Sequence, residues 1–198
     1  MNKGLLIVMS GPSGTGKGTI CEELLKTGEL VVSISATSRE MRKNEAEGVT
    51  YYYKTKQQFE QLIEQDKMLE WASYDGNYYG TPREAVERHL QEGTNVLLEI
   101  EPQGALQVKQ KLPEAVLIFV APPCMKELRR RLVERGREDE ERIQKRLEAA
   151  RWELSQAEKY NYVVINDDLQ ECVLQVRELV HKRKCQMQQI QNLLDEQF

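Results

Sequence analysis

The chain has 198 residues, and its 28 Lys and Arg residues against 32 Asp and Glu residues give a formal net charge of −4. This length fits one domain, or one domain with a small insert, and the mild acidity excludes a broad nucleic-acid-binding surface. The apolar runs fall far short of the roughly 18 residues of a membrane helix, and the amino terminus lacks the pattern of a secretory signal. We expect a cytoplasmic globular protein with neither nucleic acid nor membranes as partners.

The predicted elements alternate between strands and helices. Short apolar runs at residues 5–9, 31–34, 96–100, 116–120 and 162–165 are typical of strands buried on both faces, as in a parallel sheet covered by helices. Helical patterns cover residues 16–27, 56–65, 82–92, 126–134, 140–159 and 169–194. Thr81 is expected to cap the third of these helices, with Pro82 at its first position. The alternation predicts an α/β layered domain.

Two stretches interrupt this alternation. Residues 36–79 contain a polar loop, a run of three tyrosines and Asp75-Gly76, which is a hairpin turn signal, so we predict a small, partly antiparallel subdomain there. Residues 135–146 are charged, contain a glycine and have few apolar anchors, which predicts a mobile segment. Arginines crowd residues 129–151, and such a local positive patch on an acidic protein favours a small, highly charged anion as ligand.

The four cysteines do not have the spacing of a zinc site or a disulfide framework, which favours free thiols. These residues are Cys21, Cys124, Cys172 and Cys185.

The strongest signal is the sequence Gly11-Pro12-Ser13-Gly14-Thr15-Gly16-Lys17-Gly18-Thr19, which lies between a predicted strand and a predicted helix, the context of a phosphate-binding loop. Its glycines allow the backbone to turn tightly, so that N–H groups converge on phosphate oxygens, while the helix N-terminus and Lys17 add positive charge. A glycine-rich turn without a ligand is the alternative. Gly18 replaces the usual Ser or Thr that holds Mg²⁺, which leaves Thr19, waters or the phosphates to hold the metal.

Further motifs follow in a fixed order. They are Ser35-Ala36-Thr37-Ser38-Arg39-Glu40-Met41-Arg42, then Glu45, Gly48, Tyr51 and Tyr53, then Leu69-Glu70-Trp71-Ala72 and Asn77-Tyr78-Tyr79-Gly80-Thr81. With these motifs the sequence resembles the guanylate kinase family, over residues 5–179. This resemblance implies transfer of a phosphoryl group from ATP to GMP, and acceptance of dGMP is an expectation of the same kind.

The resemblance also implies an architecture. It is an α/β fold of the P-loop NTPase type, with a parallel sheet covered by helices, a small GMP-binding α+β subdomain and a mobile lid. One guanylate kinase-like domain would span residues 1–198. Its core would take residues 1–35, 81–125 and 160–198, its acceptor-binding subdomain residues 36–80, and its lid residues 126–159.

The phosphate of GMP would be held, by the resemblance, by Arg39, Arg42, Tyr51 and Tyr79. The residue types suit this task, because two guanidinium groups chelate a dianion and two phenols add donors without charge. Taken singly, the arginines fit a solvated loop and the tyrosines fit packing positions. The prediction therefore depends on their joint spacing.

The guanine ring would be surrounded, by the resemblance, by Ser35, Glu70, Thr81 and Glu101. One carboxylate accepts together from the imide N–H and the exocyclic amino group of guanine, whereas adenine presents an acceptor at the imide position. Taken alone, Glu70 fits a surface position, but its apolar neighbours favour a semi-buried one. Glu101 replaces the Asp that the family usually has, and Pro102 after it is expected to stiffen a loop.

On the donor side, the resemblance places Arg131, Arg135, Arg137 and Arg146 in a lid over ATP and Asn166 in a turn that flanks the adenine. Arginines that arrive on closure stabilise the charge that moves during phosphoryl transfer. A helix surface with ion pairs four residues apart is the alternative for the arginines, and a helix cap is the alternative for Asn166.

The predicted catalytic residues are Lys17, Arg39, Arg135 and Arg146, and the ATP site comprises residues 11–19 with Arg131, Arg137 and Asn166. Glu99 and Thr19 would bind a magnesium ion, either directly or through water. The acceptor phosphate is already ionised, so no general base is expected, and neither His89 nor His181 is given a catalytic role.

ATP and Mg²⁺ are the expected cofactors, and ATP and GMP the expected small-molecule partners of a monomer or homodimer. Two alternatives stay open. One is another acceptor, such as AMP, UMP or a phosphorylated sugar. The other is a non-catalytic peptide-binding module of the same fold, although such modules typically lose the phosphate loop.

Overall fold

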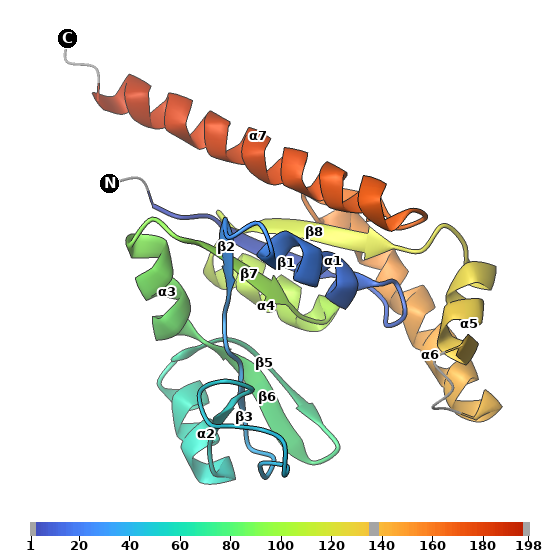
Figure 1. Cartoon of the computed structure of the whole chain (residues 1–198). Helices are drawn as coiled ribbons and strands as arrows, with labels where there is room; N and C mark the ends of the chain where they lie inside the picture. The colour runs from blue at the N-terminus through green and yellow to red at the C-terminus, as the bar shows by residue number, and fades with distance from the viewer. Residues whose placement is uncertain (1–2, 135–138, 196–198) are drawn as a thin grey trace.

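A computed structural model describes residues 3–134 and 139–195, and within them five parallel strands form the central sheet (Figure 1). The strand order is β2-β7-β1-β8-β9, so β1 lies between strands that come much later in the chain. A chain that crosses to both sides of one strand leaves a crevice at the carboxyl end of that strand, where ligands bind. The strands are β1 (Leu6–Ser10), β2 (Leu30–Val32), β7 (Asn95–Glu99), β8 (Val116–Ala121) and β9 (Tyr162–Ile165).

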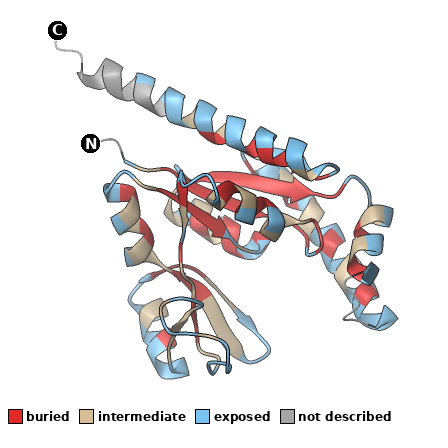
Figure 2. Ribbon diagram, in the orientation of Figure 1, coloured by how far each residue is buried: buried red, intermediate tan, exposed pale blue. Residues whose placement is uncertain are grey.

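Helices cover both faces of this sheet, which confirms the predicted α/β class. On one face, α1 (Lys17–Leu25) and α7 (Leu169–Asp195) bury side chains such as Ile20, Leu24 and Val176 against the strands. On the other face lie α3 (Arg83–Gln91) and α4 (Pro102–Lys111). Figure 2 shows the buried residues gathered along the strands and on the inner faces of the helices. Burial of this apolar surface holds the layers together.

Two details of the sequence reading were wrong. Pro102 does not stiffen a loop: it occupies the first position of α4, a helix that was not predicted. A proline there loses no hydrogen bond, because the first N–H groups of a helix have no intrahelical acceptor. Thr81 and Pro82 belong to a strand, and α3 begins at Arg83, since pairing in the sheet takes Thr81 away from a capping role.

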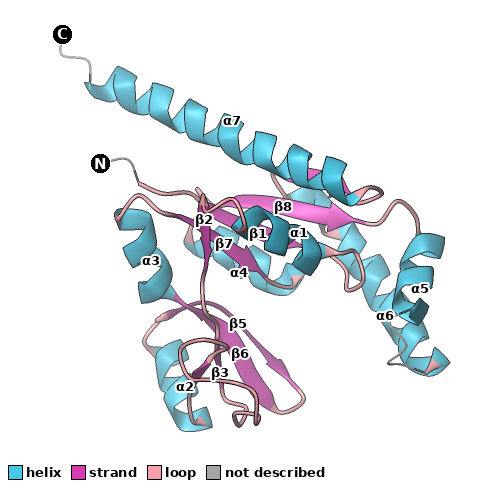
Figure 3. Ribbon diagram, in the orientation of Figure 1, coloured by secondary structure: helices cyan, strands magenta, loops and turns pink. Residues whose placement is uncertain are grey.

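A second, four-stranded sheet with the order β4-β3-β6-β5 lies below the first in the view of Figure 3. Strands β5 and β6 form a hairpin in which Asp75 and Gly76 both have positive φ (48° and 72°), as the predicted tight turn requires. Phe59 and Met68 fill a small core beneath it. The elements are β3 (Ala36–Thr37), β4 (Tyr52–Tyr53), α2 (Lys56–Glu64), β5 (Met68–Tyr74) and β6 (Asn77–Pro82).

Helices α5 (Met125–Glu134) and α6 (Glu140–Ser155) pack on each other through Leu128, Leu132 and Ala150. The helical pattern predicted for residues 140–159 ends at Ser155, and a 3₁₀ turn, η1 (Ala157–Lys159), leads into β9. Helix α7 runs across the sheet and continues past its edge (Figure 1). Of the helices in the described part of the chain, none is long and apolar enough to cross a bilayer.

Candidate active site

The phosphate loop connects β1 to α1 at the carboxyl end of the central strand. Gly11, Gly14 and Gly16 have φ values of 136°, 90° and 86°, which L side chains rarely adopt, so all three glycines are needed for this turn. A Cβ on Gly11 would also lie 2.2 Å from the Val120 carbonyl oxygen. The chain therefore reaches the N-terminus of α1 through the tight turn that the sequence predicted.

Lys17 lies inside this loop. Its Nζ donates hydrogen bonds to the carbonyl oxygens of Gly11 and Pro12 at 2.5 and 2.9 Å. Burial lowers the pKa of Lys17, while the charges of Glu99, Glu153 and Glu101 act in the opposite direction. An ammonium group held this way can exchange carbonyl oxygens for phosphate oxygens without a large movement of the side chain.

A cavity of about 390 Å³ opens beside the loop. The Asn166 amide donates to the Thr15 carbonyl oxygen at 2.7 Å, and Arg131 Nη2 donates to the Asn166 carbonyl oxygen at 3.0 Å. Loop, turn and helix α5 are thus connected through Asn166. The residues that line this cavity are Gly14, Gly16, Thr19, Arg131, Glu134, Asn166, Asp167 and Leu169.

Arg146 of α6 reaches the loop from the other side. Its Nη1 donates to the Ser13 hydroxyl oxygen at 2.8 Å, although 133 positions separate the two residues in the chain. The alternative of ion pairs four residues apart is seen on α5, where Arg130 pairs with Glu134 and the predicted ATP-site residue Arg131 pairs with Glu127. The predicted residues Arg135 and Arg137 lie outside the described residues.

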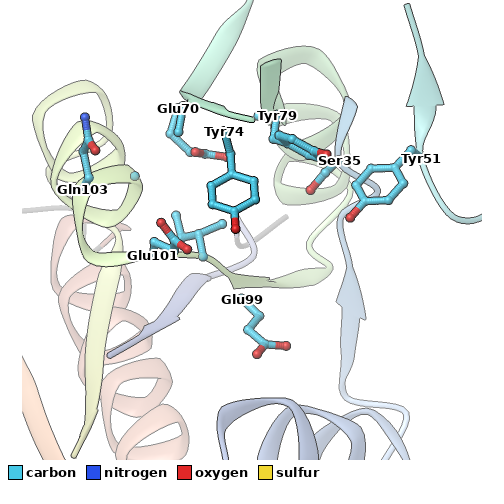
Figure 4. A pocket seen from close by; sticks show the side chains of 12 residues that line it. Ser35, Tyr51, Glu70, Tyr74, Tyr79, Glu99, Glu101 and Gln103 are labelled. Atoms are coloured by element: carbon cyan, nitrogen blue, oxygen red, sulfur yellow. The ribbon is translucent and has the colours of Figure 1, made fainter. Parts of the chain in front are cut away.

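A second cavity, of about 330 Å³, lies between the two sheets (Figure 4). Figure 4 shows Glu70, Tyr74 and Tyr79 on its upper side, Glu101 opposite them, and Ser35 and Tyr51 at one end. Tyr74, Gln103 and Gly104 also line this cavity and are not among the residues predicted from the sequence. The lining is Ser35, Tyr51, Glu70, Ala72, Tyr74, Tyr79, Gly80, Glu99, Ile100, Glu101, Gln103 and Gly104.

Glu70 is the buried carboxylate of this cavity, with 6% of its surface exposed, so it is more deeply buried than the semi-buried position expected. The Thr81 hydroxyl donates to its Oε1 at 2.7 Å. Burial raises the pKa of Glu70, hydrogen bonds from Thr81 lower it, and the charge of Glu101 adds to the rise. A carboxylate has about four acceptor positions on its two oxygens, so Glu70 can also accept from a ligand in the cavity.

Aromatic and basic groups gather at the other end of the cavity. The rings of Tyr51 and Tyr79 meet edge to face with centroids 6.1 Å apart, and the Arg39 guanidinium lies 5.7 Å from the Tyr51 centroid. Of the four residues predicted to hold an acceptor phosphate, the structure brings these three together. The fourth, Arg42, is exposed on the following turn.

Glu45 organises this end, a role that the sequence reading did not assign. It accepts from Arg39 Nη2, the Arg42 backbone N–H and the Tyr53 hydroxyl, each at 2.8 Å. The Arg39 guanidinium, with the other two donors, lowers the pKa of Glu45 to about 2. The sequence signal that could reveal this role is a carboxylate three positions after Arg42 and six positions after Arg39.

The two predicted metal-site residues lie on different sides of the phosphate loop. Thr19 lines the cavity beside the loop, whereas Glu99 lines the cavity between the sheets. Both oxygens of Glu99 would lie 3.7 Å from a Cβ on Gly18, so this carboxylate faces the start of α1. In the described residues, no group of three or more Asp, Glu, His or Cys could hold a metal. A hydroxyl and a carboxylate fit Mg²⁺ that is held mainly by substrate phosphates.

A phosphate loop at the switch point of a parallel sheet, next to a cavity with a cationic end and a buried carboxylate, defines a nucleotide-binding protein of the phosphoryl-transfer class. Comparison with known proteins narrows this class. The sequence model described as guanylate kinase matches residues 3–183. The chain is 51% identical over 187 residues to a guanylate kinase of Desulfitobacterium hafniense, with 94% of each chain covered.

It is also 50% identical over 192 residues to a guanylate kinase of Caldanaerobacter subterraneus, covering 96% of this chain and 93% of the relative. The crystal structure of guanylate kinase from Anaplasma phagocytophilum superposes with a TM-score of 0.72 at 33% identity, covering 92% of this chain and 87% of that one. The chain belongs to the guanylate kinase family.

Proposed function

We propose that this protein transfers the terminal phosphoryl group of ATP to the phosphate of GMP, giving ADP and GDP. The observation that carries the proposal is the buried Glu70–Thr81 pair beside a cavity that Tyr51 and Tyr79 also line, with the Arg39 guanidinium 5.7 Å from the Tyr51 ring. A guanine ring needs a carboxylate, and its phosphate needs cations and donors. The cavity offers both at opposite ends.

The acceptor binds through both ends of this cavity between the two sheets, which we therefore call the acceptor cavity. Arg39 and Arg42 neutralise the GMP phosphate, and the Tyr51 and Tyr79 hydroxyls donate to its oxygens. Glu45 holds Arg39 in place, as its bond of 2.8 Å supports. This arrangement fixes the attacking oxygen in position before the donor arrives.

The base is read by the carboxylate. Glu70 accepts from the two adjacent donors of guanine, while Thr81 fixes its orientation and Ser35 and Glu101 border the ring. Adenine would place a lone pair opposite Glu70, and a buried mismatch of this kind rejects a base by orders of magnitude.

The donor binds at the phosphate loop. Backbone N–H groups of residues 11–19 and the Lys17 ammonium hold the phosphates of ATP, while Asn166 and Arg131 border its cavity. Arg146 reaches the loop at Ser13, so it is placed to approach the phosphate that moves. Participation of Arg135 and Arg137 remains a prediction of the sequence.

In the reaction, an oxygen of the GMP phosphate forms a bond to the terminal phosphorus of ATP, and the bond from that phosphorus to the bridging oxygen breaks, so that ADP leaves. Mg²⁺, with Glu99 and Thr19 nearby, would neutralise phosphate charge when it is bound. Lys17 and Arg146 stabilise the charge that moves toward the bridging oxygen, while Arg39 neutralises the attacking phosphate and allows it to approach the donor. The acceptor oxygen is already ionised, so no residue has to remove a proton.

Closure of two parts over a common core accompanies this function in our proposal. Residues 36–80 would form the acceptor-binding part, residues 126–159 the lid, and residues 1–35, 81–125 and 160–198 the core. A cavity of about 580 Å³ between the hairpin tip and α6 supports this division, because it leaves room for approach. Tyr74 and Asp75 line one side of it, and Arg142, Lys145 and Arg146 line the other.

An assay that couples ADP release to a second enzyme, run with GMP, dGMP, AMP and UMP, tests the proposal. We expect GMP to be preferred, dGMP to be accepted, and AMP and UMP to react far more slowly. Preference for AMP or UMP would contradict the guanine assignment. Absence of turnover with every nucleotide, together with tight phosphopeptide binding, would favour the binding-module alternative.

Location and assembly belong to the same proposal. We place the reaction in the cytoplasm, and the four free cysteines agree with a reducing compartment. The protein would act as a monomer or homodimer, with ATP and GMP as its partners. Sedimentation of the purified protein distinguishes the two assembly states.

A further inference from the structure

Helix α4 contacts the strand that carries Glu70. Gly104, Gln107 and Lys111 are spaced three and four positions apart, so they share one face of this helix. The neighbouring face, with Ala105 and Val108, is buried in the core under the parallel sheet. Helix α4 is therefore fixed to the core on one side and presents the Gly104 face to strand β5.

Strand β5 is the edge strand of its sheet, so one side of its backbone has no strand partner there. The Gln107 amide replaces that partner at Trp71: its Oε1 accepts from the Trp71 N–H at 3.1 Å and its Nε2 donates to the Trp71 carbonyl oxygen at 2.9 Å. Lys111 Nζ donates to the Met68 carbonyl oxygen at 2.6 Å. These bonds hold the backbone on both sides of Glu70.

Gly104 lies against the Glu70 carboxylate itself. A Cβ at this position would be 2.7 Å from Glu70 Oε2, 3.3 Å from its Cδ and 3.4 Å from its Cγ. Gly104 lies within α4 and has no positive φ, so the backbone conformation does not require a glycine. Alanine would stabilise the helix at this position relative to glycine. The glycine is explained instead by the Glu70 carboxylate, which occupies the space that a Cβ would need.

We propose that the face of α4 formed by Gly104, Gln107 and Lys111 determines base specificity by fixing the depth and direction of the Glu70 carboxylate. The inference rests on the proposed function, because it concerns how guanine is chosen. A methyl group on Gly104 would push Oε2 by about 0.7 Å, from 2.7 Å to an ordinary contact of 3.4 Å. The Thr81 bond to Oε1 limits how the carboxylate can turn to compensate.

Gly104 and Gln107 are positioning residues in this proposal, since they act on the base through Glu70. Their effect must therefore appear in the affinity for the acceptor and in the choice of base, with the donor side unchanged. The choice of base is measured as the preference for GMP over inosine monophosphate, which keeps the imide N–H of guanine and lacks the exocyclic amino group.

The test measures kcat and KM for GMP, inosine monophosphate and ATP in the wild type, Gly104→Ala, Gln107→Ala and the control Gln110→Ala, which changes an exposed residue of the same helix. For Gly104→Ala we expect KM for GMP to rise about tenfold and the preference for GMP over inosine monophosphate to fall about fivefold or more. The KM for ATP should stay within about twofold, and the melting temperature should not fall. Gln107→Ala should change the same two quantities in the same direction, and Gln110→Ala neither.

A double-mutant cycle separates the contact from a general effect on folding. In the Glu70→Asp background the shorter side chain makes room for the methyl group, so Gly104→Ala should change the KM for GMP less than it does in the wild type. An unchanged KM and base preference in Gly104→Ala, or an equal effect in both backgrounds, would overturn the inference alone. Failure of the wild type to phosphorylate GMP would contradict the proposed function, and the inference with it.

Discussion

Replacing Glu70 by Gln separates base recognition from stability, because the structure predicts opposite signs for the two. Glu70 is buried in the acceptor cavity, and its Oε1 already accepts from Thr81. An amide that keeps this bond turns its NH₂ group toward the position where guanine presents donors. Binding of GMP should therefore weaken while ATP binding stays as it is.

The size of the loss follows from the bonds that change. One charge-assisted hydrogen bond contributes about 1.5–3 kcal/mol, and a buried donor left facing another donor costs about 1–3 kcal/mol. Together they predict a loss of about 3 kcal/mol or more, which is on the order of 10²-fold in kcat/KM for GMP. The coupled assay with GMP varied at saturating ATP, and then ATP varied at saturating GMP, measures both sides.

Stability should change in the opposite direction. Burial raises the pKa of Glu70 in the folded protein, so the folded state loses stability as pH rises from the unfolded carboxyl pKa through this raised value. The neutral Gln does not have this loss. Near neutral pH the variant should therefore melt at a higher temperature than the wild type, and the difference should shrink on acidification. Equal losses of kcat/KM for ATP and for GMP, or a melting temperature below that of the wild type near neutral pH, would refute this reasoning.

Three further substitutions test other parts of the site. Lys17→Ala should lower kcat by on the order of 10²-fold or more in the coupled assay, because it removes a cation from the transferred phosphate; near-normal turnover would contradict the loop assignment. Glu45→Gln should raise KM for GMP about tenfold, since it weakens the ion pair that holds Arg39, and an unchanged KM would show that Arg39 needs no such support. Asn166→Ala removes the bond to the Thr15 carbonyl and should destabilise the fold by about 1–3 kcal/mol in urea titration while raising KM for ATP; a change confined to GMP kinetics would contradict it.

Much of the parallel sheet was predictable, because its strands are buried on both faces and appear in the sequence as short apolar runs. The run at residues 162–165 matches β9 at both ends, and the others match within a residue or two. Helix α4 was missed for a physical reason. Its apolar positions are few, Gly104 weakens the helical pattern, and Pro102 resembles the start of a rigid loop unless the helix after it is known.

The residues of the candidate site also divide into those that the sequence predicted and those that it did not. Predicted residues Ser35, Tyr51, Glu70, Tyr79 and Glu101 do line one cavity. Their own residue types did not place them together, since each also fits an ordinary surface or packing position; the order of several motifs did. Glu45 and Gly104 were not predicted as site residues, because their importance depends on contacts with Arg39 and Glu70 that form only in the folded protein.

The sequence by itself determined the phosphate loop, because its chemistry is local. Glycines with positive φ, a lysine six positions after the first of them and the start of a helix are contiguous, so the backbone that they dictate is already the binding element. Tertiary structure decided the acceptor cavity. It forms only when α4 packs on the core and offers Gly104 to Glu70, 34 positions earlier in the chain, and no local preference of either segment specifies that distance. Packing across the sheet edge sets this distance, so the shape of the cavity around Glu70 is a property of the folded protein.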